Sequence, residues 1–261
     1  MKKLMLIAVT GLILVAIAAP ALALGPLDAD AGLALNGKNV WRGLVRTPDP
    51  VLQPEVGLGV LGFTAGFWGN IDTNDVNGSE WEFNQINWTL GYELGLAILK
   101  LDAGFIYYDY SNGSDVDTSE FYLGAAVNVL LSPSLKVYQD LDAHKGAYWE
   151  AQISHGVTMG SNELELSGGV GFGSKGYIEG YFGPASELPT VPEVPGDASL
   201  TDYHIKAALP FHPLPMFTVT PSVMWSSLSG DVKTIVDSSE GVAYHGESDA
   251  FVWGLNASFS F

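Results

Sequence analysis

Polar, charged and aromatic side chains recur at every second position in several segments of this sequence. Glu120 and Tyr122 show this spacing, and so do Tyr148 and Glu150. Alternate residues of an extended strand point to the same side, so each series would form one polar face. Such a face offers carboxylates that attract cations and rings on which a cyclic solute can stack. This chemistry is typical of a solvated passage.

Catalytic and metal-binding patterns are weaker. Asp140 and Glu150 are expected to be cross-strand neighbours beside a loop with His144, which suits a cation site better than acid–base catalysis. The segment 72–80 is rich in oxygen ligands, but Val76 occupies the fifth place of an EF-hand spacing. The chain has no cysteine, which excludes disulfides and thiolate metal sites. We therefore predict no enzyme activity, no metal and no cofactor.

The polar faces require strands, and alternation of period two dominates the chain after its N-terminal segment. About twelve strands are predicted, with the ranges 33–46, 52–61, 63–72, 80–92, 96–110, 118–131, 135–143, 147–156, 162–174, 200–210, 216–228 and 248–261. In the fourth, Glu82 and Asn84 would share their face with Ile86. A β-bulge near Gln85 would restore the register.

Composition and the N-terminus indicate an exported, acidic protein. The 261 residues include 29 Asp+Glu and 11 Lys+Arg, a net charge of −18, which disfavours nucleic acid as a partner. Lys2 and Lys3 precede an apolar run and the triplet Ala21-Leu22-Ala23, so residues 1–23 are predicted to be a cleaved signal peptide. No later apolar run is long enough for a membrane-spanning helix, so residues 24–261 would cross a membrane only as strands.

The connections between the predicted strands alternate between long and short. An even strand count with this alternation is typical of outer-membrane barrels, which have long external loops and short periplasmic turns. A secreted β-sandwich is the alternative, but its strands average about 5–6 residues and many here reach ten or more. We predict an all-β, transmembrane, antiparallel up-and-down β-barrel in the outer membrane of a Gram-negative bacterium, in contact with its lipid and lipopolysaccharide.

The C-terminal segment resembles the last strand of outer-membrane barrels, which alternates apolar residues and ends on an aromatic one. Leu255, Ala257, Phe259 and Phe261 have this pattern. The resemblance implies recognition of Phe261 by the barrel-assembly machinery.

Short motifs elsewhere carry a second resemblance. They are Asn39-Val40-Trp41-Arg42-Gly43, Gln53-Pro54, Gly66-Phe67-Trp68-Gly69, Tyr107-Tyr108-Asp109-Tyr110, Ser132-Pro133-Ser134 and Tyr138-Gln139-Asp140. Together they are similar to motifs of a proteobacterial family of conserved hypothetical outer-membrane β-barrel proteins, with Gln139 where a second Tyr is expected. The resemblance implies a barrel in the cell envelope and no particular activity.

If the apolar face meets lipid, the other face lines the lumen. The residues expected there are Lys38, Arg42, Glu55, Trp68, Glu82, Lys100, Asp102, Tyr108, Glu120, Tyr122, Lys136, Tyr138, Asp140, Tyr148, Glu150, Glu163, Glu165, His204 and Lys206. With Glu80, Asp142 and Asp202 the lumen would hold eleven acidic and five basic residues. Arg42 is expected to form an ion pair with Glu55 on the neighbouring strand.

Three functional hypotheses follow. The first is a narrow diffusion channel that favours cations or neutral small solutes, because water would have to solvate the surplus carboxylates. The second is a structural or surface-interaction barrel, plugged by its own side chains, since twelve strands lie between the filled eight and the open sixteen. An outer-membrane hydrolase is a distant third.

Overall fold

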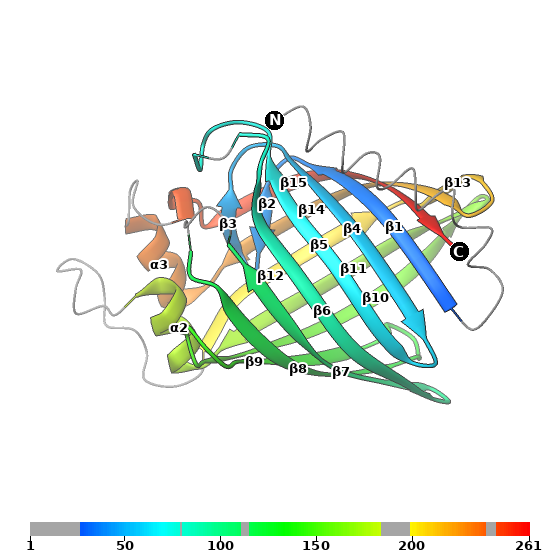
Figure 1. Cartoon of the computed structure of the whole chain (residues 1–261), viewed down its shortest axis with the longest axis horizontal. Helices are drawn as coiled ribbons and strands as arrows, with labels where there is room; N and C mark the ends of the chain where they lie inside the picture. The colour runs from blue at the N-terminus through cyan, green and yellow to red at the C-terminus, as the bar shows by residue number, and fades with distance from the viewer. Residues whose placement is uncertain (1–26, 79, 111–114, 184–198, 239–243) are drawn as a thin grey trace.

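The computed structural model describes residues 27–78, 80–110, 115–183, 199–238 and 244–261. The predicted signal peptide and nearly all of the proline-rich segment 183–195 lie outside these residues. Twelve of the described strands form a closed antiparallel barrel (Figure 1). They are β1 (Leu27–Asn36), β4 (Val51–Val60), β5 (Phe63–Asp72), β6 (Phe83–Leu96), β7 (Leu99–Asp109), β8 (Thr118–Val127), β9 (Ser134–Asp140), β10 (Ala147–Met159), β11 (Asn162–Gly173), β12 (Ser199–Ala208), β14 (Phe217–Leu228) and β15 (Asp249–Ser260).

Hydrogen bonding runs around the whole barrel. Each barrel strand pairs with the barrel strands before and after it in the chain, and β1 closes the barrel by pairing with β15. β12 pairs directly with β14, and the short strand β13 (Phe211–Leu214), in the connection between them, pairs with β14. A closed sheet leaves no strand edge unpaired, which is the condition for strands to lie in hydrocarbon. The predicted fold class is thereby confirmed.

Eleven predicted strands are present, with ends that differ by a few residues. The predicted bulge is also present: Asn70 pairs with Gln85 but Ile71 pairs with Phe83, so Asn84 is the additional residue. The first predicted strand, 33–46, is wrong. The chain leaves the barrel wall after Asn36 and forms a separate two-stranded sheet, β2 (Asn39–Trp41) and β3 (Leu44–Thr47).

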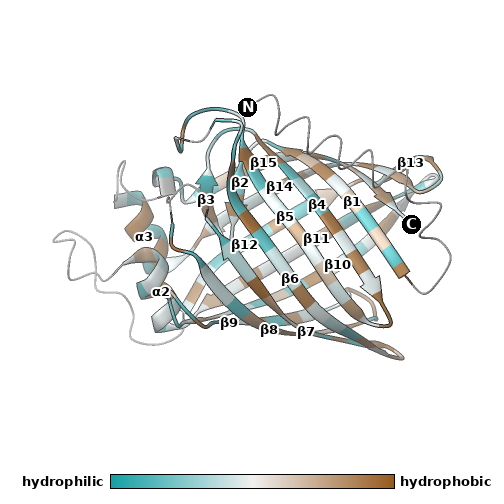
Figure 2. Cartoon of the chain, in the orientation of Figure 1, coloured by the Kyte–Doolittle hydropathy of each residue, from teal (hydrophilic) through white to brown (hydrophobic). Residues whose placement is uncertain are grey.

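The outer face of the barrel is apolar. Leu90, Leu123 and Ile153 point outward and are 50–64% exposed, although each stands in the middle of a regular strand. Apolar and polar residues alternate along the same strands (Figure 2). A broad apolar surface on a closed barrel matches a lipid environment. Among the described helices, none combines the length and the apolar character that crossing a membrane requires.

The two ends of the barrel differ. One, which we call the loop end, carries α2 (Lys175–Phe182), α3 (Gly230–Ser238), the short 3₁₀ helix η2 (Tyr244–Gly246) and the β2–β3 hairpin (Figure 1). The opposite, turn end has tight connections, such as Leu61-Gly62 between β4 and β5. Ser174 directly precedes α2, and its side chain accepts a hydrogen bond from the Tyr177 N–H and so caps the first turn of the helix.

A labelling experiment tests which end faces outward. Ser238 is exposed at the end of α3, and Pro133 is exposed in the turn between β8 and β9. Because the chain has no cysteine, Ser238→Cys and Pro133→Cys would each create one reactive site. We expect an impermeant maleimide to label only Ser238→Cys on intact cells and both variants after lysis. The reverse pattern on intact cells would invert the orientation.

Candidate functional site in the barrel interior

The β2–β3 hairpin turns within two residues, Arg42 and Gly43. Their φ angles are 49° and 79°, so both adopt the left-handed conformation required by the tightest hairpin turns. Gly43 meets this requirement without strain and also avoids a clash, because a Cβ there would lie 2.6 Å from the Asp202 Cβ and 2.7 Å from the Leu228 Cδ2. The turn therefore places Arg42 inside the barrel and against its wall.

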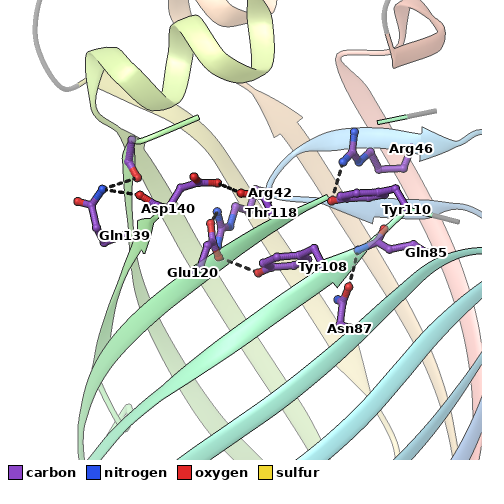
Figure 3. A network of polar contacts seen from close by, with 11 residues as sticks. Arg42, Arg46, Gln85, Asn87, Tyr108, Tyr110, Thr118, Glu120, Gln139 and Asp140 are labelled. Carbon is purple, nitrogen blue, oxygen red and sulfur yellow. Dashed lines mark hydrogen bonds and ion pairs between the residues drawn. The ribbon is translucent and has the colours of Figure 1, made fainter. Parts of the chain in front are cut away.

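Arg42 is bound to Glu120 of β8 by two parallel hydrogen bonds. The Nη1–Oε1 and Nη2–Oε2 distances are 2.8 and 2.7 Å, and the Tyr108 hydroxyl donates to the same carboxylate at 2.7 Å (Figure 3). The side chains are 8% and 2% exposed. Burial acts to lower the pKa of Arg42, but the charge and hydrogen bonds of Glu120, together with the nearby Tyr108 and Tyr177, raise that pKa above its ordinary value. The guanidinium therefore stays charged.

Aromatic rings surround the same guanidinium. Its Cζ lies 4.3 Å from the ring centre of Tyr148, 4.4 Å from Tyr138 and 4.5 Å from Trp41. Ring faces attract a cation, and the attraction grows when water is excluded. Arg42, Glu120 and these three rings, which we call the Arg42 cluster, hold the tip of the hairpin against β8, β9 and β10.

Apolar packing fills the rest of the loop end. Leu44 of the hairpin lies in one buried cluster with Tyr177 and Ile178 of α2 and with Val232 of α3. On the other side, Val45 packs against Ala250 and Val252, which face inward on β15. The hairpin and the two helices thus form an apolar plug inside the loop end.

The predicted ion pair between Arg42 and Glu55 is wrong. That expectation treated residues 33–46 as one continuous strand, whereas the hairpin carries Arg42 across the barrel to β8. Glu55 stays on β4 and accepts a hydrogen bond from Asn256 at 3.2 Å.

Interior polar side chains near the loop end are buried and hydrogen-bonded. The Tyr148 hydroxyl donates to Asp202 at 3.1 Å across Gly171, where any Cβ would collide with both groups. Asp140 accepts hydrogen bonds from the Thr118 hydroxyl and from three backbone N–H groups of residues 142–145, so its carboxylate orders the loop. Asp140 is not a cross-strand neighbour of Glu150, which pairs with Lys136.

Interior charges towards the turn end are exposed instead. Lys100 pairs with Glu93, and their side chains are 57% and 45% exposed. Lys136 pairs with Asp102 at 2.6 Å. Glu163, Glu165 and Lys206 are exposed and form no ion pair with a described residue. This half of the barrel is therefore open to solvent, and we call it the vestibule.

Most residues predicted to line the lumen lie on the inner face of barrel strands: Glu55, Trp68, Lys100, Asp102, Tyr108, Glu120, Tyr122, Lys136, Tyr138, Asp140, Tyr148, Glu150, Glu163, Glu165, His204 and Lys206. Lys38 and Arg42 belong to the inserted hairpin segment. Glu82 precedes β6 and is exposed in the connection, so its placement on a strand is wrong.

Two interior features were missed. Asp28 and Asp30 lie on β1, because that strand begins at Leu27 and not at residue 33, and they add acidic charge to the vestibule. The β2–β3 hairpin was not predicted from the sequence because its turn is Arg42-Gly43. Two-residue hairpin turns are usually recognised by Asn-Gly or Asp-Gly. The glycine between the apolar pairs Val40-Trp41 and Leu44-Val45 was the available signal.

Comparison with known proteins supports the fold. No protein-family model and no curated protein matches the sequence, so the resemblance to an outer-membrane family stays a prediction. Among solved structures, the NanC porin matches with a TM-score of 0.51 and 13% identity over 89% of this chain and 98% of that chain. At this identity the likeness shows the fold alone.

Two weaker matches are LpxR from Salmonella typhimurium and an outer membrane channel from Pseudomonas putida F1. Their TM-scores are 0.49 and 0.46, with 8% and 10% identity, over 88% and 91% of this chain and 99% and 97% of theirs. Likenesses this slight carry no argument about function. The chain has the fold of an outer-membrane β-barrel.

Proposed function

We propose that the protein is a narrow outer-membrane diffusion channel, without enzyme activity, whose lumen favours cations or neutral small solutes. The observation that carries the proposal is the solvent-exposed vestibule with charged side chains. A barrel that served only as a scaffold would gain stability by packing this space, because exposed interior charges require water around them.

Cavities extend the vestibule toward the plug. One, of about 400 Å³, is lined by Glu163, Glu165 and Lys206. Lys206 also lines a second cavity of about 270 Å³, which reaches Trp41 beneath the hairpin. Polar space thus extends from the turn end to the plug, and the hairpin is the element that would control passage beyond it.

The direct test is single-channel conductance of the refolded protein in a planar bilayer. Stepwise currents would support the channel. Absence of current from protein shown to be folded, by a difference in gel migration between unheated and heated samples, would contradict it.

A plugged structural barrel is the second candidate. It is favoured by the buried apolar contacts among the hairpin, α2 and α3, which resemble a permanent core more than a loose loop. A hydrolase has less support. Asp140, the carboxylate predicted beside the His144 loop, is occupied by four hydrogen bonds that order the chain.

Ion selectivity should depend on the vestibule carboxylates. We expect Glu163→Gln with Glu165→Gln to move the reversal potential in a salt gradient toward zero, because the unpaired negative charge in the path falls. The effect should weaken at 1 M salt, where the Debye length is about 3 Å.

The matched control is Glu179→Gln with Asp237→Asn. These residues are exposed on α2 and α3, so the change in net charge is the same but lies outside the vestibule. An equal shift in both double variants would mean that Glu163 and Glu165 do not line the conducting path.

A further inference from the structure

The cavity of about 270 Å³ beneath the hairpin differs in chemistry from the vestibule around it. The described residues that line it include five amide side chains and two tryptophans, but no carboxylate. Its volume is just below the lower end, about 300 Å³, of typical small-molecule sites. It lies at the inner limit of the polar passage, where a solute arriving from the vestibule would meet the plug.

Trp68 lines this cavity with an aromatic ring that is not packed against another described ring. It lies on the inner face of β5, between Glu55 of β4 and Asn87 of β6. Trp41 is packed against Tyr108, Tyr181 and the Arg42 guanidinium, whereas Trp68 makes no ring pair with a described residue. An indole combines a large apolar face with one N–H donor, which suits a ligand with both apolar and hydroxyl-bearing surfaces.

The amides around the ring are held in place by one another. Asn36 donates to Gln53 at 2.7 Å, Gln53 donates to Asn70 at 2.9 Å, and Gln85 donates to Asn87 at 2.9 Å. Gln53 also donates to Asn39 at 3.3 Å, so both of its donor hydrogens are used, but its carbonyl has two lone pairs and can accept one further hydrogen bond. The Asn87 Nδ2 has no described partner. Fixed amides with spare donors and acceptors are suited to hydroxyl groups.

The charges favour a ligand without net charge. Lys38 is neutralised by Glu247, which leaves Lys206 as the cation without a described partner on the cavity wall. A cation would find no carboxylate there. An anion would first have to pass the acidic vestibule, with Asp28, Asp30, Glu163 and Glu165 exposed.

We propose that this cavity binds one ring of a neutral saccharide, with the C–H face of the sugar stacked on Trp68 and its hydroxyls hydrogen-bonded to Gln53 and Asn87. The proposal deepens the proposed channel function by naming the solute class, and it rests on the vestibule as the route of entry. Lys206 would contribute one further hydrogen bond to a hydroxyl group.

Isothermal titration calorimetry tests the site without a conductance measurement. Maltose is titrated into the folded full chain in detergent micelles, and the binding heat is measured. Wild type should bind maltose, and Trp68→Ala should weaken binding about tenfold or more, while Trp68→Phe, which keeps a ring, should lose less. Trp88→Ala is the matched control, because Trp88 lies on the outer face, 51% exposed, and its loss should leave binding unchanged.

Three results would overturn the proposal: no maltose binding by folded wild type, equal loss in Trp68→Ala and Trp88→Ala, or much tighter binding of glucuronate than of maltose. Since a folded Trp68→Ala is required, its gel migration is measured first, and Trp68→Phe with Asn87→Ala replaces it if it fails to fold. Current steps without maltose binding would keep the channel and remove the sugar site. Maltose binding without current would keep the site and remove the channel.

Discussion

Arg42→Ala is expected to destabilise the barrel by about 3–5 kcal/mol and to increase its conductance. The substitution leaves Glu120, 2% exposed, as a buried carboxylate without its cation, and such a loss costs more than the pair itself contributes. It also removes the guanidinium from between Trp41, Tyr138 and Tyr148. Urea unfolding in lipid vesicles measures the first effect, and planar-bilayer recording measures the second.

A double-mutant cycle separates the ion pair from general damage. The double variant, Arg42→Ala with Glu120→Gln, should be destabilised by less than the sum of the single changes. Each single change leaves one buried charge without its partner, whereas the double change leaves none. Arg42→Lys should be intermediate, since an ammonium keeps the charge but loses the two parallel hydrogen bonds. Arg46→Ala is the matched control on the same hairpin, as Arg46 pairs with Asp115 at a more exposed position.

The conductance arm discriminates between a gate and a permanent plug. If the Arg42 cluster holds a gate, folded Arg42→Ala should show larger or more frequent current steps than wild type and Arg46→Ala. Lower stability with unchanged current would mean that the apolar contacts of Leu44 and Val45 keep the plug in place. Additive effects in the cycle would contradict the energetic coupling that the geometry implies.

The barrel could be predicted from the sequence because the pattern that indicates it lies within each single strand. Period-two alternation, as in the segment Glu120–Val127, follows from the opposite environments of the two faces of one strand, and it survives without knowledge of the neighbours. Even the bulge at Asn84 was visible, because an extra residue reverses the alternation within a single segment.

The plug was not predictable because its causes are distant in the chain. Arg42 meets Glu120 from 78 residues away, and no local pattern distinguishes an Arg that continues a strand from one at a hairpin tip. The α2 helix contains Gly176 and Gly180, poor helix formers, and its position depends on Gly146, where any Cβ would collide with the Tyr177 backbone. The structure of the loop end is therefore determined by packing between distant segments and not by the helix or strand propensity of each segment.

Leu123→Arg is expected to cost about 2–4 kcal/mol of barrel stability in a bilayer. Leu123 lies in the middle of β8, pairs with Ala103 and Val137, and is 54% exposed on the apolar outer face. An arginine there must carry its charge into hydrocarbon or distort the bilayer around it, and this penalty is greatest near the midplane. Urea unfolding in vesicles of defined lipid thickness measures the difference.

The control places the same side chain on the opposite face. Gln152 lines the interior cavity with Glu163 and Glu165, so in Gln152→Arg the new charge meets water and carboxylates. We expect that variant to stay within about 1 kcal/mol of wild type, because an exposed ion pair changes stability little. Thinner bilayers should reduce the cost of Leu123→Arg but not alter Gln152→Arg, since only the former touches lipid. Equal costs on both faces would contradict the assignment of inside and outside on which the vestibule, the gate and the sugar site all depend.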